Sequence, residues 1–214
     1  SVISNVETLQ SKNNLLFLSI MSIIVALLHL SNSSMENTET LNGSKIKQTA
    51  MAQENSDNDI SKVILKNKNG AKIELSGDQS TGIYAKRGII RNSGEISIGK
   101  SSTGIYLVED NGATGSQGSV ITNESSGIIK IGENSTGIYY RSESTGTNTL
   151  SNGGIVNNGK IISSSNGVIA MTFNNSIAGS NRVFENTSTG FIDLQGDNST
   201  GMYATGAGTY TALN

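Results

Sequence analysis

The sequence predicts an all-β protein that folds as a right-handed parallel β-helix, or β-solenoid, of about five coils. Two observations lead to this fold class. A Gly-Ile-Tyr motif, or a close variant of it, recurs between residues 82 and 203. In addition, only 35% of the residues are hydrophobic and 5% aromatic, whereas Ser, Thr, Asn and Gly are abundant. This composition favours short strands stacked in one direction over a globule built around one central core.

Each repeat contains three short elements in a fixed order. The first is two apolar residues, one variable residue and Asn, and the second is a strand of alternating character. The third is Gly-Ile-Tyr, usually preceded by Ser-Thr. Copies of the first element are residues 64–67, 89–92, 120–123, 155–158 and 183–186. Copies of the second are 72–75, 95–98, 129–131, 160–161 and 192–194, and copies of the third are 82–84, 104–106, 137–139, 201–203 and the degenerate 167–169.

Stacking of these repeats explains how so few apolar side chains can form a core. Alternation in the strand 95–98 places Ile96 and Ile98 on one face and Ser97 on the other. One repeat cannot enclose a core alone. Strands of successive repeats stacked about 4.8 Å apart form continuous apolar columns and pair the backbone groups of neighbouring coils. The repeat glycines are expected to supply positive φ angles at the corners of each coil.

The Asn that ends the first element has two interpretations. Stacked Asn side chains can hydrogen-bond to one another along the axis as a ladder, and Asn also tolerates the left-handed backbone conformation at turns. A ligand-binding role would instead need exposed, unpaired amides. We expect the structural ladder, formed by Asn67, Asn92, Asn123, Asn158 and Asn186.

The Tyr of the third element is more open to interpretation. In the degenerate copy this position is Ile169, so it accepts an apolar side chain, and packing between coils is the favoured prediction. An exposed aromatic stack would instead hold sugar rings or the surface of a partner. The column consists of Tyr84, Tyr106, Tyr139 and Tyr203.

Repeat length varies mainly at one position, between the third element and the next first element. The variable segments are residues 85–88, 107–119, 140–154 and 170–182. They all leave from the same corner of the predicted coil, and insertions that line one face of a solenoid often form its binding surface. Recognition by these corner loops and simple drift in exposed loops both explain the pattern.

The N-terminal part predicts two further segments. Residues 15–30 form an apolar run that follows Lys12, so we expect residues 1–34 to be a signal peptide or a membrane anchor containing an apolar helix. A buried helix of a globular core is the alternative. Residues 35–62 are polar and are expected to form a flexible linker, and residues 63–214 the solenoid. Because the chain begins with Ser1 and stops within a repeat at Asn214, we interpret it as a fragment.

No motif in the sequence predicts catalytic chemistry, a cofactor or a metal site. The chain has no Cys, and its net charge of −2 does not favour nucleic acid as a partner. Polysaccharide lyases and hydrolases with β-helix folds need carboxylates or basic residues that converge on a groove. In the position after the repeat glycine a single Lys instead stands between acids, which suits charge pairing at a solvated corner. These residues are Asp78, Lys100, Glu133 and Asp197.

The repeats resemble a known family at this level of detail. Residues 132–139 and 196–203, together with the Asn-x-Gly-x-Ile-x-Ile strands, are similar to passenger repeats of large autotransporter adhesins from anaerobic Gram-negative bacteria. The resemblance covers residues 63–214. It implies a long β-solenoid displayed on the cell surface by a C-terminal outer-membrane β-barrel in a missing part of the chain. It further implies adhesion to host cells or other bacteria through a surface receptor, protein or glycan, without catalysis. A purely structural stalk for a missing recognition module is the alternative, and a polysaccharide lyase or hydrolase is a further one.

Overall fold

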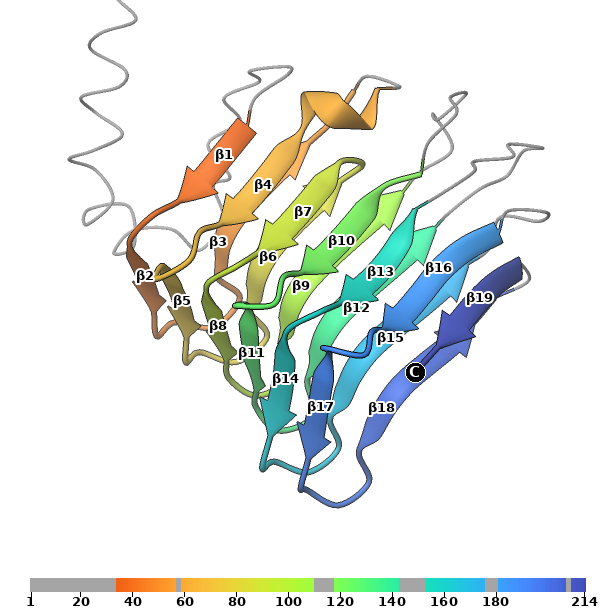
Figure 1. The fold of residues 1–214 in the computed structure, drawn as a ribbon. Helices are drawn as coiled ribbons and strands as arrows, with labels where there is room; N and C mark the ends of the chain where they lie inside the picture. Colours follow the sequence, from red (N-terminus) through yellow and green to blue (C-terminus); the bar gives the residue numbers. More distant parts are fainter. Residues whose placement is uncertain (1–33, 57–58, 110–117, 143–152, 176–180, 207–208) are drawn as a thin grey trace, which may run out of the picture.

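A computed structural model describes residues 34–56, 59–109, 118–142, 153–175, 181–206 and 209–214. They form a parallel β-solenoid in which each coil contributes one strand to each of three sheets (Figure 1). All strand pairs are parallel and in register from coil to coil, so the predicted all-β solenoid is confirmed. Besides the strands, the described residues contain one short 3₁₀ helix at Ile60–Lys62.

The three sheets contain seven, six and six strands. The first sheet consists of β1 (Ser34–Asn37), β4 (Ile64–Asn67), β7 (Ile89–Asn92), β10 (Val120–Asn123), β13 (Gly154–Asn157), β16 (Asn181–Asn186) and β19 (Thr209–Leu213). The second consists of β2 (Thr40–Gly43), β5 (Lys72–Leu75), β8 (Glu95–Ile98), β11 (Ile128–Ile131), β14 (Lys160–Ser163) and β17 (Phe191–Leu194). The third consists of β3 (Thr49–Glu54), β6 (Thr81–Lys86), β9 (Thr103–Glu109), β12 (Thr136–Ser142), β15 (Ile169–Asn175) and β18 (Thr200–Thr205).

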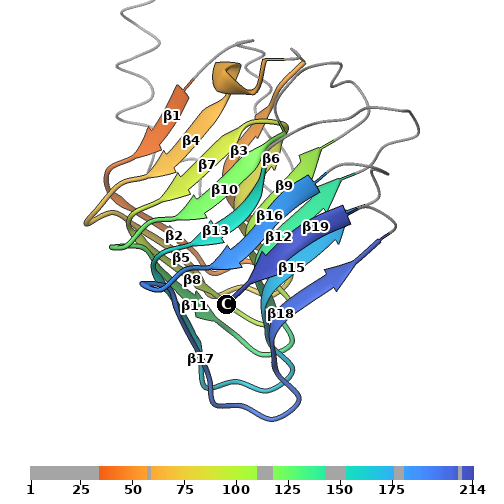
Figure 2. The ribbon, with the colours of Figure 1, turned by 45° about the vertical axis from the view of Figure 1, so that its right-hand side comes forward.

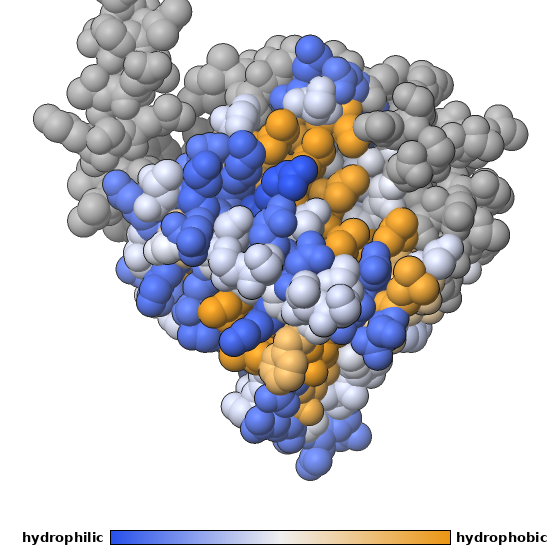
Figure 3. Space-filling view, in the orientation of Figure 1, coloured by the Kyte–Doolittle hydropathy of each residue, from blue (hydrophilic) through white to orange (hydrophobic). Residues whose placement is uncertain are grey.

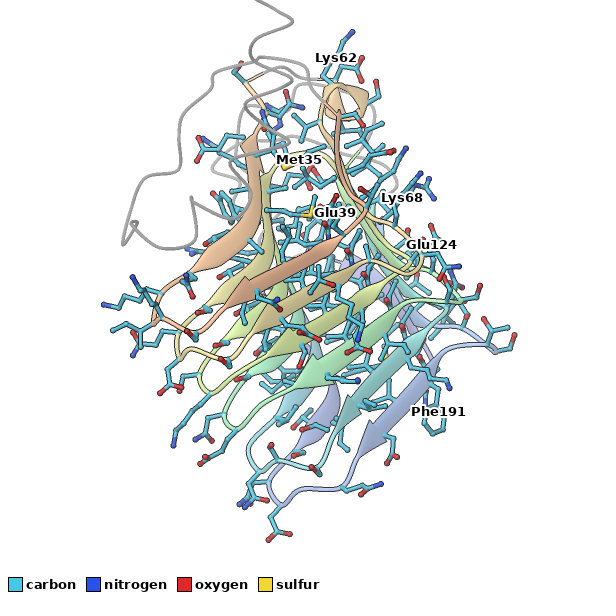
Figure 4. The ribbon with its side chains drawn as sticks, turned by 90° about the vertical axis from the view of Figure 1, so that its left-hand side faces the viewer. Met35, Glu39, Lys62, Lys68, Glu124 and Phe191 are labelled. Carbon is cyan, nitrogen blue, oxygen red and sulfur yellow. The ribbon has the colours of Figure 1, made fainter. Side chains whose placement is uncertain are left out.

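The solenoid begins earlier in the chain than the sequence predicts. Strands β4 to β18 make the five expected coils within residues 63–214, but β1, β2 and β3 form a further coil before them. The range 35–62 is therefore largely part of the solenoid, and the prediction of a flexible linker there is wrong. This first coil is held by parallel pairing to the second coil and by Met51, which belongs to the core. Met35 (labelled in Figure 4) and Leu41 pack against that core.

The predicted apolar helix and signal or anchor segment fall on residues 1–33, outside the described part of the chain. Within the described ranges, no helix has the length and apolar character needed to cross a membrane.

The core is a set of side-chain columns that run along the solenoid axis. Ile83, Ile105 and Ile138 occupy one inward column of the third sheet and are fully buried. In the neighbouring inward column the side chains become larger along the chain, from Ala85 and Leu107 to Tyr140 and Phe173. Aromatic packing then dominates: the ring centroids of Tyr140 and Phe173 are 5.1 Å apart, and those of Phe173 and Phe184 are 5.7 Å apart.

The register of the fifth coil corrects two assignments made from the sequence. Tyr139 pairs with Thr172, and Ile138 with Met171, so residues 167–169 are not the copy of Gly-Ile-Tyr. Ile169 instead pairs with Thr136. In the first sheet, Asn123 pairs with Asn157 rather than Asn158. The observed pairing of these two strands differs from the sequence alignment because the strands of both neighbouring coils determine which residues share a column. The local residue pattern alone does not determine it.

The Asn ladder is confirmed, with Asn157 in the place predicted for Asn158. In each step, Nδ2 of one Asn donates to Oδ1 of the Asn in the next coil over 2.7–3.0 Å. The central members are fully buried, which leaves no free amide for a ligand. The ladder consists of Asn37, Asn67, Asn92, Asn123, Asn157, Asn186 and Asn214.

A second ladder, of serines, was not expected from the sequence. Oγ of Ser102 accepts from the backbone N–H of Ser80 at 3.0 Å, and Oγ of Ser135 accepts from the N–H of Ser102 at 2.9 Å. All three are buried, so the hydroxyls satisfy backbone groups that would otherwise lack a partner at the corner. This role explains the Ser of the Ser-Thr-Gly motif.

The repeat glycines at the corner between the second and third strands act differently from the prediction. Positive φ angles of 53–58° at this corner belong to Lys47, Gln79, Ser101, Asn134 and Asn198. The glycine two residues earlier is needed for close approach: a Cβ on Gly99 would lie 2.6 Å from the carbonyl oxygen of Ser76 in the preceding coil. The earlier glycine therefore provides the absence of a side chain, whereas in the fifth coil Gly167, with a φ angle of 68°, occupies the positive-φ position itself, as predicted.

Candidate binding surface

The edge between the third strand of one coil and the first strand of the next is the place of the predicted loop insertions. Parts of these segments are strand, because β9 extends to Glu109, β12 to Ser142 and β15 to Asn175. Residues 110–117, 143–152 and 176–180 of these segments lie outside the described ranges. The flanking strand ends lie along one edge of the solenoid (Figure 2), so all three variable segments depart from that edge. Recognition by these segments stays a prediction.

A buried polar column lies at the base of this edge. The carboxylate of Glu109, which is fully buried, accepts hydrogen bonds from the Tyr140 hydroxyl and, at 3.3 Å, from the backbone N–H of Ser119. The hydroxyl of Ser142 donates to Oδ1 of Asn175 at 2.9 Å. Glu109 and Ser119 flank the variable segment 110–117, so their contact ties its two ends together. This geometry fixes the base from which the segment leaves.

The Tyr column lies on the outer face of the third sheet. Tyr84, Tyr106 and Tyr139 alternate with inward-facing residues and are half-buried, whereas Tyr203 is 49% exposed. The Tyr106 and Tyr139 rings stack with centroids 5.1 Å apart at 13°, and Tyr84 is tilted against Tyr106 at 5.8 Å. The rings thus pack on one another from coil to coil, as predicted, but on the outer face and with part of each ring accessible.

A Thr column runs parallel to the Tyr column on the same face. Thr81, Thr103 and Thr136 pair in register and are half-buried. No side chain projects between the two columns in these coils, because the intervening residues are a glycine and a fully buried Ile. A Cβ on Gly104 would lie 2.5 Å from the Gly137 carbonyl oxygen, so these glycines are required for coil stacking.

The first sheet has a different outer face. Its first outward column is aliphatic and half-buried, and Figure 3 shows apolar side chains gathered in a band across this side of the molecule. The outward column next to it carries mostly charged or polar residues. The aliphatic members of this column are Ile64, Ile89, Val120 and Val183, with Gly154 between the last two.

Charged side chains mainly form pairs between neighbouring coils. Lys100 lies 3.2 Å from Glu133 at the corner where the sequence predicted charge pairing, and Lys130 lies 2.8 Å from Glu95. The Arg91–Glu124 pair closes at 2.9 Å. Such exposed pairs contribute little, about 0–1 kcal/mol each. Among the residues that the structure describes, no three or more His, Cys, Asp or Glu side chains come together as a metal site would require.

The ion pair between the first two coils gives a pH-dependent prediction. Lys66 donates to Glu36 at 2.9 Å, and this hydrogen bond together with the charges of Lys66 and Lys68 lowers the pKa of Glu36 below 4.5. A carboxylate with a lowered pKa in the folded state stabilises it above the unfolded pKa, and loses this effect as pH falls through the folded value. We expect the hydrogen-exchange protection factors of β1 to drop below about pH 4.5. Glu36→Gln should weaken that drop, and an unchanged drop would contradict the assignment.

Comparison with protein-family models, with curated proteins and with solved structures finds no match to this chain.

Proposed function

We propose that this chain is a non-catalytic, surface-exposed passenger fragment of an autotransporter that mediates adhesion to host cells or other bacteria. The observation that supports the proposal is the combination of a continuous solenoid with variable segments that depart from one edge of it. In this proposal the solenoid is a spacer that carries recognition segments away from the cell, and an outer-membrane β-barrel outside residues 1–214 holds it there.

The geometry suits such a spacer. Every coil is bonded to its neighbours through three parallel sheets and through the Asn ladder. Each added coil lengthens the solenoid by about 4.8 Å, the strand separation. Segments repeated along one edge can each bind weakly and still give firm attachment through avidity. The partner is a surface receptor, either protein or glycan.

Shortening the edge segments tests the proposal. The deletions should stop at the strand ends, because Glu109 and Tyr140 are buried and belong to the solenoid. The link between β6 and β7 consists of Arg87 and Gly88, and the retained Glu109 and Ser119 stand beside them in the next coil. One Gly in place of residues 110–117 and another in place of 143–152 therefore leave links that are no shorter than this one. We expect attachment of chain-coated beads to epithelial cells or to bacteria to fall about tenfold or more, the loss of roughly 1.4 kcal/mol of binding free energy.

The matched control alters the opposite corner. Asp78→Ala with Gln79→Gly changes exposed corner residues and should leave attachment unchanged. Full attachment by the shortened chain, with normal circular dichroism, would favour a structural stalk instead. Appearance of unsaturated or reducing-end products from pectin or host glycans would contradict the non-catalytic proposal.

A further inference from the structure

The first coil forms an open end of the solenoid within the described part of the chain. Strands β1, β2 and β3 each pair there with a neighbour on one side only, the side of the second coil. Figure 4 views the molecule from the side of this coil and labels Met35. Met35 and Leu41 pack against the core but are only partly buried. Proteins commonly cover such strand edges with a helix or a loop, and the terminal units of solenoids need a cover that faces water.

The segment that precedes this end in the chain is apolar on most of its surface. Residues 15–30 contain only three polar side chains, Ser19, Ser22 and His29. Together with Ala26 they follow the spacing i, i+3, i+7 and i+10, which places them on one side of an α-helix. A helix formed by this run would therefore have a narrow stripe of polar and small residues and apolar residues elsewhere. Such a helix suits a protein surface that covers its apolar side and leaves the stripe in water.

The length of the run matches the open end of the solenoid. As an α-helix, residues 15–30 would be about 24 Å long. The strands of the first coil contain four, four and six residues, which corresponds to sides of about 13 to 20 Å. Residues 31–33 link the run to Ser34 in β1, so Leu30 stays within about 14 Å of that strand. By contrast, the run is shorter than the roughly 20 apolar residues that span a bilayer as a helix.

We propose that residues 15–30 form a helix that covers the open end of the first coil, with Ser19, Ser22 and His29 toward solvent. The short link selects this occupant over a second copy of the chain, because it gives the segment an effective concentration in roughly the millimolar range at this end. The apolar side of the helix buries the partly exposed Met35 and Leu41, and the helix keeps the strand edges from pairing with another chain. The inference is independent of the proposed adhesion. It takes the place of the signal peptide or membrane anchor expected for this run.

Methionine methyl signals in NMR spectra of the full chain measure where the segment lies. The sequence contains no Cys, so Ala26→Cys provides a single attachment site for a nitroxide spin label, on the solvent side of the proposed helix. Met51, Met171 and Met202 occupy one column of the third sheet, in the first, fifth and sixth coils. Met202 is thus five strand spacings from Met51, or about 24 Å. The column serves as a ruler along the solenoid axis.

We expect the spin label to cause loss of the Met35 and Met51 methyl signals and to leave the Met202 signal unchanged. Equal loss at Met51 and Met202 would place the segment along the side of the solenoid, and no loss at any of them would place it away from the solenoid. Either result overturns the inference. Loss that appears only when the label and the methyl groups are on different copies would assign the end to a second copy. Return of the signals when phosphatidylglycerol vesicles are added would assign the run to a membrane. Both outcomes also overturn it.

Two matched variants of the spin-labelled chain test which side of the helix packs on the first coil. Ile20→Asn with Ile24→Asn changes the apolar side opposite the stripe, so the Met35 and Met51 signals should return. Ser19→Asn with Ser22→Asn introduces the same side chains on the stripe and should leave the loss of signal as it is. Met171 is fully buried, so its resolved signal reports that the solenoid is folded in each variant. Persistent loss in the first variant, or return of the signals in the control, would refute the proposed packing.

Discussion

Asn157→Ala should lower the free energy of unfolding by about 2–4 kcal/mol, whereas Asn158→Ala should lower it by less than about 1 kcal/mol. Asn157 is fully buried, and its Oδ1 accepts from Asn123 Nδ2 at 2.7 Å while its own Nδ2 donates to Asn186 at 2.7 Å. Its removal leaves a buried donor on one side and an acceptor on the other without their partners. An unsatisfied buried polar group costs about 1–3 kcal/mol.

Asn158 is the matched control because it is adjacent, has the same side chain and lies outside the ladder. Its Oδ1 accepts from the Thr187 hydroxyl at 3.0 Å, and that hydroxyl also donates to the carbonyl of Asn157 at 3.1 Å. Urea unfolding followed by circular dichroism, with linear extrapolation to water, measures both variants. Equal losses, or a larger loss for Asn158→Ala, would show that the ladder does not stabilise this coil.

The same pair of residues shows how far the sequence predicts the fold. Repetition of the motif predicts the three strands per coil, the parallel stacking and the existence of an Asn ladder. It does not distinguish Asn157 from Asn158, since the two are adjacent and both come after the apolar pair at residues 155 and 156. The structure decides through its neighbours: pairing of Ile121 with Ile155 keeps both side chains in the core, and this register brings Asn157 into the ladder. A shift by one residue would turn the strand inside out.

The first coil, formed by β1, β2 and β3, is the largest part of the fold that the sequence analysis did not predict. Its strands contain few apolar residues, so no periodic pattern marks them, and the polar composition suggested a linker. This coil needs few apolar residues of its own because the second coil already provides paired strands and a core surface for it. Asn37, with Met35 two residues before it, repeats the ladder position and was the available signal.

The candidate binding surface was only partly accessible to prediction. The sequence identifies the Tyr column, but the degenerate copy at Ile169 misplaced the fifth coil and made the column look interior. The true counterpart is Thr172. The Thr column beside it and the side-chain-free strip between the two columns depend on which residues face outward after two consecutive buried positions, Gly104 and Ile105. Strict alternation does not predict this arrangement.

Gly104→Ala should destabilise the solenoid by about 1–3 kcal/mol, because the new methyl group overpacks the contact between two coils. Its Cβ would lie 2.5 Å from the carbonyl oxygen of Gly137 and 3.2 Å from Cγ2 of Ile129. The fourth coil can retreat only by disturbing the coils stacked above it. Gly201→Ala occupies the same motif position in the last complete coil, where the nearest atom is Cγ2 of Ile192 at 4.0 Å.

Neither glycine has a positive φ angle, so a difference between the two variants reports the room available for a Cβ and not a need for the backbone conformations that favour Gly. Gly201→Ala should be neutral or stabilising by up to about 1 kcal/mol, because Ala restricts the unfolded chain. Ala170 occupies this position in the fifth coil, so a methyl group is tolerated at one site of this column, which limits the expected loss at Gly104. Urea unfolding of both variants measures the difference. If the two lose equal stability, the glycines are needed for the strand conformation itself, and the close approach of the coils is not the reason for the repeated Gly.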